Sequence, residues 1–466
     1  MMVLSLRLRV FLIFLTLAVG CIGATAIALY SGVYRGDVPF DSAIGPFIIA
    51  GFLLLGLVMS AWFAFDKYIA RPIDRLAAEM RVRAHCGTSH ELDLAETHYL
   101  GDFAHAADAV TRRLGEATFE TAGTVARETA RLEAERQRLT ACLTEIPVAT
   151  IVVSATDKIV LYDGQAAEIL AQTATPRLNA PIADYLDGDA ITSAKQALAP
   201  NGNKINFEVS NAARSVTHSA VMRAFADGGY LLAFQNADIQ LAPDAARPLV
   251  YDFSLLERAP PPTLIEAPLR DLVYCVFDTE TTGLIPHRDE IVQMGAIRIV
   301  DGKLVEGETF DMLVDPGGPI PRASSKIHGI SDEMVAGQPK IAEAGRRFFE
   351  FAKDSVLVAH NAPFDMSFLR RHEKNIGVSF DHPIVDTVLV SAVVFGMTES
   401  HMLDAVCERL GISIEKKDRH TALGDARVTA EAMKRMIPLL EARGIDTFGK
   451  LLTETRKHGR LVADLN

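Results

Sequence analysis

The sequence predicts a chain of several domains that is anchored in a membrane and ends in an α/β domain. Two long apolar runs lie near the N-terminus, short β-like runs follow, and the last part has strand-like runs that then alternate with helices. Its 466 residues suffice for several domains, since one domain usually takes roughly 100–200 residues. The expected segments are the anchor (1–66), a helical linker (67–145), a small α+β domain (146–237), a proline-rich linker (238–270), the α/β domain (271–442) and a C-terminal tail (443–466).

The two apolar runs, 10–30 and 44–65, contain no charged residue, and each is long enough to cross a hydrocarbon core as a helix. Cationic residues precede the first run and follow the second. They are Arg7 and Arg9 before the first run, and Lys67, Arg71, Arg75, Arg81 and Arg83 after the second. The positive-inside rule therefore predicts a multi-pass membrane protein with both termini and the later domains in the cytoplasm. The resemblances to bacterial proteins described below imply that this membrane is the bacterial inner membrane. Small residues at Ala24-Thr25-Ala26 leave a cleaved signal peptide as the alternative for the first run.

The segment after the second apolar run resembles the start of a HAMP linker, the helical coupling module of bacterial membrane sensors. The residues that carry this resemblance are Ala70–Leu76, which read ARPIDRL, and the later phrase Leu100-Gly101-Asp102-Phe103. The alternative is a plain amphipathic helix whose arginines meet anionic lipid.

Residues 111–144 are rich in Ala, Glu and Arg and contain no proline. Apolar residues recur seven apart at Val125, Leu132, Leu139 and Ile146, which favours a short parallel coiled coil and hence a homodimer. Polar residues at the companion positions leave an exposed single helix as the alternative.

From residue 146 to residue 237 the pattern changes to short β-like runs around a small helix. Two runs, 149–154 and 158–162, form a predicted hairpin, and three more follow at 204–209, 216–225 and 230–234. This order, with the phrase Ile146–Ile151, resembles a PAS domain, which implies a ligand-binding or a dimerising and transmitting role. Proline-rich residues 238–270 then predict an extended linker.

Composition narrows the function classes. The net charge is −12, which argues against an extended surface for duplex nucleic acid, because such a surface must neutralise phosphates. A substrate held at one end by metal and pocket fits this charge better. The five cysteines are scattered without CxxC spacing, so neither a disulfide framework nor a zinc site is indicated.

The C-terminal domain begins with a short apolar run at 272–277 that predicts a buried strand, with Asp278 at the C-terminal end of that strand. The next carboxylate is Glu280, two residues later. In an extended backbone, residues i and i+2 point to the same side, so the two carboxylates converge. Unpaired carboxylates at such a distance repel each other unless a cation holds them ionised. The pair therefore predicts a divalent-metal site of hard oxygen ligands.

Two later blocks give this pair its context. Residues His360–Asp365 read HNAPFD after a second apolar strand, and His420–Ala426 read HTALGDA before a helix. With Phe277–Gly283, which reads FDTETTG, these blocks resemble the three motifs of DEDDh 3′–5′ exonucleases, in the form found in the epsilon (proofreading) subunit of bacterial DNA polymerase III. The resemblance covers about 269–442 and implies a ribonuclease-H-like fold.

The resemblance implies a role for each matching residue. Asp278, Glu280, Asp365 and Asp425 would be metal ligands for two Mg²⁺ or Mn²⁺ ions, and His420 the general base. Catalysis is thus assigned to His420, Asp278 and Glu280. Taken singly, Asp365 could be a helix cap, His420 a surface histidine, and Asp425 a first-turn carboxylate favoured by the helix dipole.

The resemblance also implies which residues contact the substrate. The residues assigned to it are Thr281, Thr282, Gly283, His328 and Asn361. Members of the family that the motifs resemble usually carry a glutamate five residues before the position of His328. This chain has Ala323 there, so a contact to the 3′-terminal sugar is lost. The leading hypothesis is a membrane-anchored exonuclease that releases nucleoside monophosphates from single-stranded or frayed 3′ ends of DNA. The alternatives are a ribonuclease or oligoribonuclease on the same fold, and a membrane sensor with a nucleic-acid-binding module. Association with a polymerase in DNA replication is left open.

Overall fold

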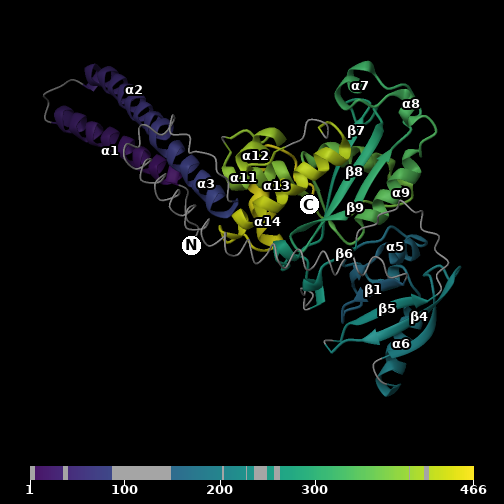
Figure 1. The fold of residues 1–466 in the computed structure, drawn as a ribbon. Helices are drawn as coiled ribbons and strands as arrows, with labels where there is room; N and C mark the ends of the chain where they lie inside the picture. The colour runs from purple at the N-terminus through teal and green to yellow at the C-terminus, as the bar shows by residue number, and fades with distance from the viewer. Residues whose placement is uncertain are drawn as a thin grey trace. The chain divides into compact units, whose positions relative to one another are not determined.

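The computed structural model describes residues 6–34, 40–86, 148–201, 204–226, 228–235, 249–256, 263–397, 399–413 and 419–466 (Figure 1). The predicted coiled coil and the second HAMP-like phrase lie outside these residues. The chain divides into two units, Met1–Thr121 and Ala122–Asn466, and each is described by itself.

The first unit is helical. Helices α1 (Leu6–Tyr34) and α2 (Phe40–Phe65) pack against each other, with the rings of Phe11 and Trp62 5.3 Å apart. A π-helical turn (Asp66–Ala70) joins α2 to α3 (Arg71–Cys86). Two stretches, Val10–Ala28 and Phe47–Ala77, are long and apolar enough to cross a membrane. Large apolar side chains on both helices face outward; they include Ile13, Ile27, Phe52 and Leu57.

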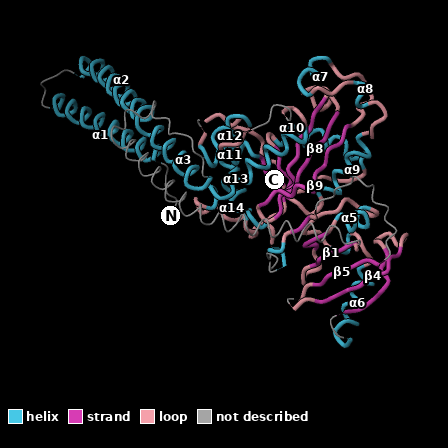
Figure 2. The backbone as a smooth tube through the Cα atoms, viewed as in Figure 1, coloured by secondary structure: helices cyan, strands magenta, loops and turns pink. Residues whose placement is uncertain are grey.

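The second unit begins with a domain built on an antiparallel sheet, which we call the sheet domain (148–256). Its strands are β1 (Ala149–Val153), β2 (Ile159–Tyr162), β3 (Lys204–Ser210), β4 (Thr217–Ala224), β5 (Tyr230–Gln235) and β6 (Val250–Tyr251), in the order β3-β4-β5-β1-β2-β6 (Figure 2). Helix α5 (Gly164–Ala171) follows β2, and its first turn is capped by Asp163, which accepts a hydrogen bond from the Ala166 N–H. Helix α6 (Gly188–Asn201) precedes β3. The expected small α+β domain is present as a sheet with helices, and its PAS-like identity stays a prediction.

Part of the predicted proline-rich linker is structured. Strand β6 pairs with the edge of β2, and the 3₁₀ turn Phe253–Leu256 follows it. Further on, Leu269 is fully buried, and its N–H donates to the carbonyl of Asp446. These segments are ordered because each offers backbone groups to a free partner, which composition alone does not reveal.

The C-terminal domain contains a five-stranded sheet in the order β11-β10-β7-β8-β9. Strands β7 (Tyr274–Thr281), β8 (Ile291–Val300) and β9 (Lys303–Leu313) are antiparallel, whereas β10 (Val356–Ala359) and β11 (Ile384–Asp386) run parallel to β7 and to each other. The expected α/β layout, with strands first and then helices alternating with strands, is thereby confirmed.

Helices cover both faces of this sheet (Figure 1). The bounds are α7 (Arg322–His328), α8 (Asp332–Val335), α9 (Ile341–Ala352), α10 (Ala362–Ile376), α11 (Thr387–Phe395), α12 (Leu403–Leu410), α13 (Ala422–Glu441) and α14 (Phe448–Thr455). One core joins Cys275 and Phe277 of β7 to Phe348 of α9 and Phe368 of α10. Helix α13 packs against β7 and β8 on the opposite face, to which Asp278 and Glu280 belong.

The expected C-terminal tail belongs to this domain. Helix α14 buries Leu451, and the side chain of the last residue, Asn466, accepts from the N–H of Ile384 at 3.0 Å and donates to its carbonyl at 2.6 Å. An amide side chain thus satisfies the open edge of β11.

Helix α13 approaches β8 most closely at Gly295. A Cβ atom added to this glycine would lie 2.1 Å from the backbone nitrogen of Leu423, in the first turn of α13. The Leu423 nitrogen belongs to the backbone of α13, and a Cβ at position 295 would be fixed to the backbone of β8. Neither atom can rotate away from the other. The distance between β8 and the N-terminus of α13 therefore depends on the missing side chain.

We expect Gly295→Ala to separate the first turn of α13 from the sheet and to lower the free energy of unfolding by about 3 kcal/mol, at the upper end of the cost of overpacking. Denaturant unfolding of the purified chain measures this change. Gly318→Ala is the matched control, because a Cβ there meets nothing within 4 Å. Equal stability of the two variants would contradict the assigned close packing.

Candidate metal centre

Two carboxylates of the site lie on β7. Asp278 and Glu280 are paired with Gly295 and Gln293 of β8, and the same face carries both side chains. The sequence placed Asp278 at the C-terminal end of the strand, and the structure extends the strand three residues further, because β8 continues to pair with β7 as far as Thr281. The parallel neighbour β10 pairs only up to Val276. Asp278 therefore has a strand on one side and open space for side chains on the other.

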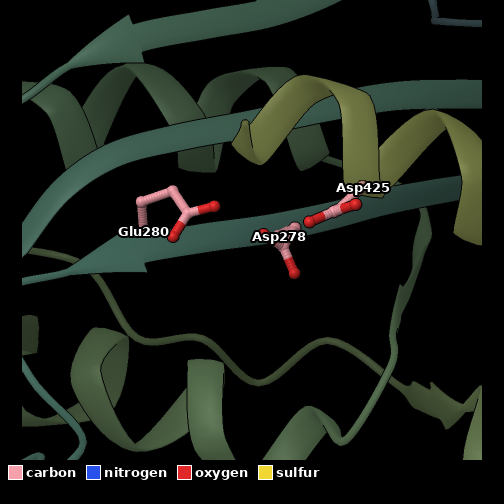
Figure 3. Close-up of side chains that lie close together, drawn as sticks. All are labelled: Asp278, Glu280 and Asp425. Atoms are coloured by element: carbon pink, nitrogen blue, oxygen red, sulfur yellow. The ribbon is translucent and has the colours of Figure 1, made fainter. Parts of the chain in front are cut away.

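The third carboxylate comes from the first turn of α13. Thr421 caps this helix by accepting from the Gly424 N–H at 3.2 Å, and the side chain of Gln293 accepts from the Ala422 N–H at the same distance. The turn brings Asp425 to Asp278 and Glu280, and one carboxylate oxygen from each of the three lies within 4.8 Å of the others (Figure 3). Residues almost 150 positions apart thus converge as the sequence predicted.

Asp365, the remaining predicted ligand, is buried on α10. Its Oδ1 accepts from the N–H of Thr279 at 3.1 Å and from the hydroxyl of Thr279 at 2.6 Å. Thr279 stands between the two carboxylates of β7, so this contact fixes Asp365 beside Asp278. Asp365 is outside the three-carboxylate group defined above, and its role as a fourth ligand stays a prediction. Sequence reasoning passed over Thr279, because a threonine in a strand is commonplace.

The electrostatics of the group favour a cation. Burial raises the pKa of Asp278 well above its usual range, and Asp365, Glu280 and Asp425 raise it further. Burial, followed by the charges of Asp425 and Asp365, raises the pKa of Glu280 to about 7. Burial also raises the pKa of Asp365 to about 7, against the opposing hydrogen bonds from Thr279. Clustered carboxylate oxygens are hard donors, so this set fits Mg²⁺ or Mn²⁺ and not a soft-ligand metal.

The predicted general base lies on the turn that leads into α13, as expected from the sequence. His420 is exposed and has a φ of 58°, in the left-handed region. Its neighbour Arg419 reaches the Oδ1 atoms of Asp425 at 3.3 Å and of Asp404 at 2.6 Å. Sequence reasoning missed this arginine; its only signal was a cation one residue before the histidine.

Comparison with known proteins agrees with this geometry. The sequence profile of the family described as Exonuclease matches residues 275–433. The chain is 32% identical to the DNA polymerase III subunit epsilon-like protein of Rhodobacter capsulatus, and the match covers 99% of each chain. The chain belongs to this epsilon-like family. Its C-terminal part is an exonuclease domain with a ribonuclease-H-like, mixed α/β fold, and exonucleases of this family depend on divalent metal ions.

Other relatives match the exonuclease domain alone. The chain is 35% identical to the PolC-type DNA polymerase III of Clostridium perfringens over 47% of its own length, but the match spans only 15% of that longer protein. Similar solved structures include Exonuclease X in complex with 5′ overhanging duplex DNA, with 24% identity, a TM-score of 0.32 and coverage of 39% of this chain and 99% of that chain. Another is the nuclease domain of 3′hExo, a DEDDh family member bound to rAMP, with 17% identity, a TM-score of 0.33 and coverage of 37% and 94%.

In the exonuclease domain, the residues after Glu280 shape a turn. The Thr281 hydroxyl donates to the carbonyl of Gly283 at 2.7 Å, and the Thr282 hydroxyl accepts from the Glu290 N–H at 2.9 Å. A Cβ on Gly283 would lie 2.3 Å from the carboxylate of Asp289. These contacts explain the residue types without a substrate, and the predicted substrate contacts stay predictions.

Two further predicted substrate residues lie on other elements. His328 is buried at the end of α7; its Nδ1 accepts from the Ile330 N–H at 3.0 Å, and its Nε2 has no hydrogen-bond partner within the described residues. Burial lowers the pKa of His328, which favours the neutral ring. The ring borders a hollow of about 510 Å³ that Gln293 and Thr421 also line. Asn361, with a φ of 69°, begins α10.

Asp386 organises the start of α10. Its carboxylate accepts from the N–H groups of Ala362 at 2.8 Å and Val388 at 2.7 Å, and more weakly from Asn361 at 3.4 Å. These backbone contacts give Asp386 a structural role. Asp386 thereby places the helix that carries Asp365.

Replacing one carboxylate tests the repulsion. In metal-free protein at pH 8, Asp278→Asn should raise the free energy of unfolding, because burial and the charges of Asp365, Glu280 and Asp425 disfavour the ionised form of Asp278 and the substitution removes that charge. The same variant should lose most of the stabilisation that Mn²⁺ gives the parent chain. Thermal unfolding with and without Mn²⁺ measures both effects. An Asp278→Asn chain that is less stable than the parent without metal would contradict the assigned repulsion.

The raised pKa values also predict a pH dependence. In the metal-free chain, the pKa of Glu280 is raised from 4.5 to about 7, so its unfavourable contribution to stability develops as pH rises from 4.5 and is complete above 7. Metal binding requires the ionised form. The increase in unfolding temperature on adding Mn²⁺ should therefore be larger at pH 8 than at pH 6. A larger increase at pH 6 would contradict the assignment.

Proposed function

We propose that the chain is a membrane-anchored, divalent-metal-dependent 3′–5′ exonuclease that hydrolyses phosphodiester bonds at the 3′ ends of DNA and releases nucleoside monophosphates. The observation that carries the proposal is the convergence of Asp278, Glu280 and Asp425 on one point beside the turn of His420. Membership of the epsilon-like family supports the class of reaction.

The residues divide the chemistry between them. Asp278, Glu280, Asp365 and Asp425 would hold two Mg²⁺ or Mn²⁺ ions, which supply an activated water and neutralise charge on the leaving oxygen. His420 accepts a proton from the water as its oxygen bonds to phosphorus and the bond from phosphorus to the 3′ oxygen of the preceding nucleotide breaks. The exposure of His420 gives its ring access to that water. Thr281, Thr282, Gly283, His328 and Asn361 would line the terminal nucleotide.

RNA is the second candidate substrate. Position 323, four residues before Ile327 and five before His328, carries an alanine in α7, so no carboxylate from this position can bind the terminal sugar hydroxyl. A site without that contact discriminates less between the sugars. The same chain could therefore act as a ribonuclease or oligoribonuclease.

The proposed location follows from the first unit. Helices α1 and α2 expose apolar side chains along their length, and the cationic residues flank their outer ends. We infer a multi-pass anchor in the bacterial inner membrane, with HAMP-like, coiled-coil and PAS-like modules between the anchor and the exonuclease domain. A homodimer through these modules fits this arrangement. The tether argues against a role as the main replicative proofreader, which must travel with its polymerase.

The test is product analysis on 5′-labelled DNA and RNA oligomers of one sequence, single-stranded and duplex, with Mn²⁺ or Mg²⁺. The expected result is stepwise shortening from the 3′ end of DNA and release of monophosphates. His420→Gln should lower kcat by about 10²–10⁴-fold, which is the usual loss when a general base is removed. Asp446→Asn, an exposed carboxylate paired with Lys450, is the control and should retain activity.

Three outcomes would overturn parts of the proposal. Shortening from the 5′ end would refute the direction, and faster turnover of RNA would replace the substrate. Tight binding of oligomers without any hydrolysis would leave a nucleic-acid-binding sensor.

A further inference from the structure

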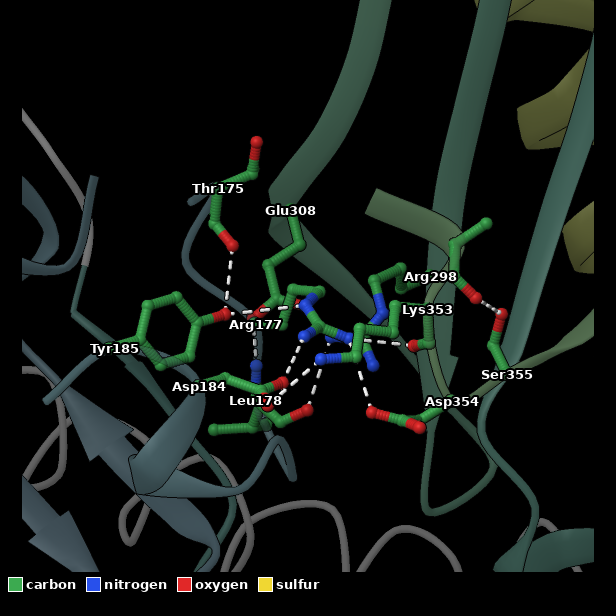
Figure 4. A network of polar contacts seen from close by, with 11 residues as sticks. Thr175, Arg177, Leu178, Asp184, Tyr185, Arg298, Glu308, Lys353, Asp354 and Ser355 are labelled. Atoms are coloured by element: carbon green, nitrogen blue, oxygen red, sulfur yellow. Dashed lines mark hydrogen bonds and ion pairs between the residues drawn. The ribbon is translucent and has the colours of Figure 1, made fainter. Parts of the chain in front are cut away.

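A buried polar network joins the sheet domain to the exonuclease domain (Figure 4). At its centre is the ion pair of Arg298 on β8 and Glu308 on β9, with 2.5 Å between Arg298 Nη1 and Glu308 Oε2. Both side chains are almost inaccessible to solvent, at 1% and 2% exposure. The metal carboxylates do not take part in this pair, so the proposed chemistry does not explain it.

The sheet domain hydrogen-bonds to this ion pair through the peptide groups of Leu178 and the hydroxyl of Tyr162. Glu308 accepts hydrogen bonds from the Leu178 N–H and, at 2.8 Å, from the hydroxyl of Tyr162. Arg298 donates to the carbonyl of Leu178 at 3.1 Å. Burial raises the pKa of Tyr162 well above its usual range, so its hydroxyl remains a donor. The ion pair therefore binds both polar groups of Leu178.

A second contact fixes the same loop to the end of α9. Arg177, at 1% exposure, donates to the carbonyl of Lys353 at 2.7 Å and pairs with Asp184 at 2.6 Å. Lys353 also pairs with Asp184, at 2.9 Å. A positively charged guanidinium at a helix C-terminus interacts favourably with the negative end of the helix dipole. Two neighbouring residues, 177 and 178, are thus held by three parts of the exonuclease domain, namely β8, β9 and the end of α9.

Buried charges of this kind need all of their partners. Removing one partner leaves a polar group without water and without a hydrogen bond, which is costly. Docking supplies partners to the Leu178 peptide, to Glu308 and to Nη1 of Arg298, whereas Nε of Arg298 has no hydrogen-bond partner within the described residues. We therefore regard the contact as built for this pair of domains.

The Arg298–Glu308 ion pair lies at a bulge between β8 and β9, and this bulge contacts α13, the helix that carries Asp425. Ile297 pairs with Thr309 and Ile299 with Leu304, so β9 places the extra residues 305–308 opposite Arg298 alone. Such bulges redirect strands and side chains. Within this bulge, Glu306 contacts Arg427 of α13 at 2.5 Å, two residues after Asp425.

Both strands are also connected to the first turn of α13, β8 directly and β9 through Gln293. Gly295, three residues before Arg298, touches the backbone of Leu423 and pairs with Asp278. Asp311, three residues after Glu308, accepts from the side chain of Gln293 at 2.8 Å, and Gln293 accepts from the Ala422 N–H. A shift of the bulge would thus move Asp425 relative to Asp278.

We propose that Arg298 and Glu308 are positioning residues of the metal centre, and that the sheet domain sets their position by holding the Leu178 peptide. The sheet domain is then part of the working exonuclease, because its docking fixes the distance between Asp425 and the carboxylates of β7. This inference rests on the proposed function and adds to it a way in which the preceding domain acts on metal binding.

The test perturbs the network from the sheet domain only, in the full chain. Tyr162→Phe combined with Arg177→Met removes the hydroxyl and the guanidinium but leaves every residue of the exonuclease domain unchanged. Residues that couple two sites typically change the coupling by about 0.5–2 kcal/mol, and we expect the corresponding loss of about 2–30-fold in Mn²⁺ affinity, measured by calorimetric titration, and in kcat. KM for the oligonucleotide should not change.

Two comparisons separate positioning from general stability. Tyr230→Phe removes a hydroxyl that donates to Asp157 at 2.7 Å within the sheet domain, and it should leave Mn²⁺ affinity unchanged. Glu308→Gln keeps an acceptor for Leu178 and Tyr162, so it should retain more Mn²⁺ affinity than Glu308→Ala. Amide hydrogen exchange at Ala422–Asp425 should accelerate in the Tyr162→Phe/Arg177→Met chain and not in the control.

Parental Mn²⁺ affinity in the Tyr162→Phe/Arg177→Met chain would overturn the inference, even if its unfolding temperature falls. A parent chain that binds Mn²⁺ but cleaves no nucleic acid would refute the proposed function, while the comparison of Mn²⁺ affinities still decides the positioning role. A parent chain that binds no Mn²⁺ would overturn both.

Discussion

The mutual repulsion of buried carboxylates is the constraint on which the exonuclease domain depends. Asp278, Glu280 and Asp425 are brought together although burial raises the pKa of each. The charges of neighbouring carboxylates raise the pKa of Asp278 and Glu280 further, whereas Arg419 and His420 lower the pKa of Asp425. Such a group persists only if the surrounding fold prevents its members from moving apart. The first turn of α13 has this task, and the backbone contact at Gly295, the Gln293 side chain and the Thr421 cap all act on it. Without metal, the carboxylate cluster therefore lowers the stability of the exonuclease domain. Such a loss of stability at a functional site is common in proteins.

Much of this could be predicted because the motifs are local. The spacing of Asp278 and Glu280 on a strand gives their common direction, and the helix after His420 gives the first-turn position of Asp425. The pattern of apolar runs gives the α/β class, and the resemblance to a known family supplies the ribonuclease-H-like layout. These are properties of short segments, and short segments carry their own periodicity.

What the sequence left out depends on contacts between distant residues. Strand β7 extends past Asp278 because β8 pairs with it, and no property of residues 278–281 alone reveals that partner. Thr279 holds Asp365 across 86 positions, and Asn466 closes the edge of β11 across 82. Arg298 and Glu308 look like ordinary strand residues until the sheet domain covers them. Charged residues are usually solvated, so a sequence gives no sign of the few that are buried.

The interface network gives the sheet domain a physical meaning that its resemblance alone does not. A domain joined by a loose linker could only hold the exonuclease near the membrane. A domain whose Leu178 peptide completes a buried ion pair also constrains β8 and β9, and through them the helix that supplies Asp425. Any event that moves the loop of residues 177–178 must then either break buried hydrogen bonds or carry the bulge with it. Because buried polar groups tolerate few intermediate arrangements, such a contact suits two discrete states better than a gradual one.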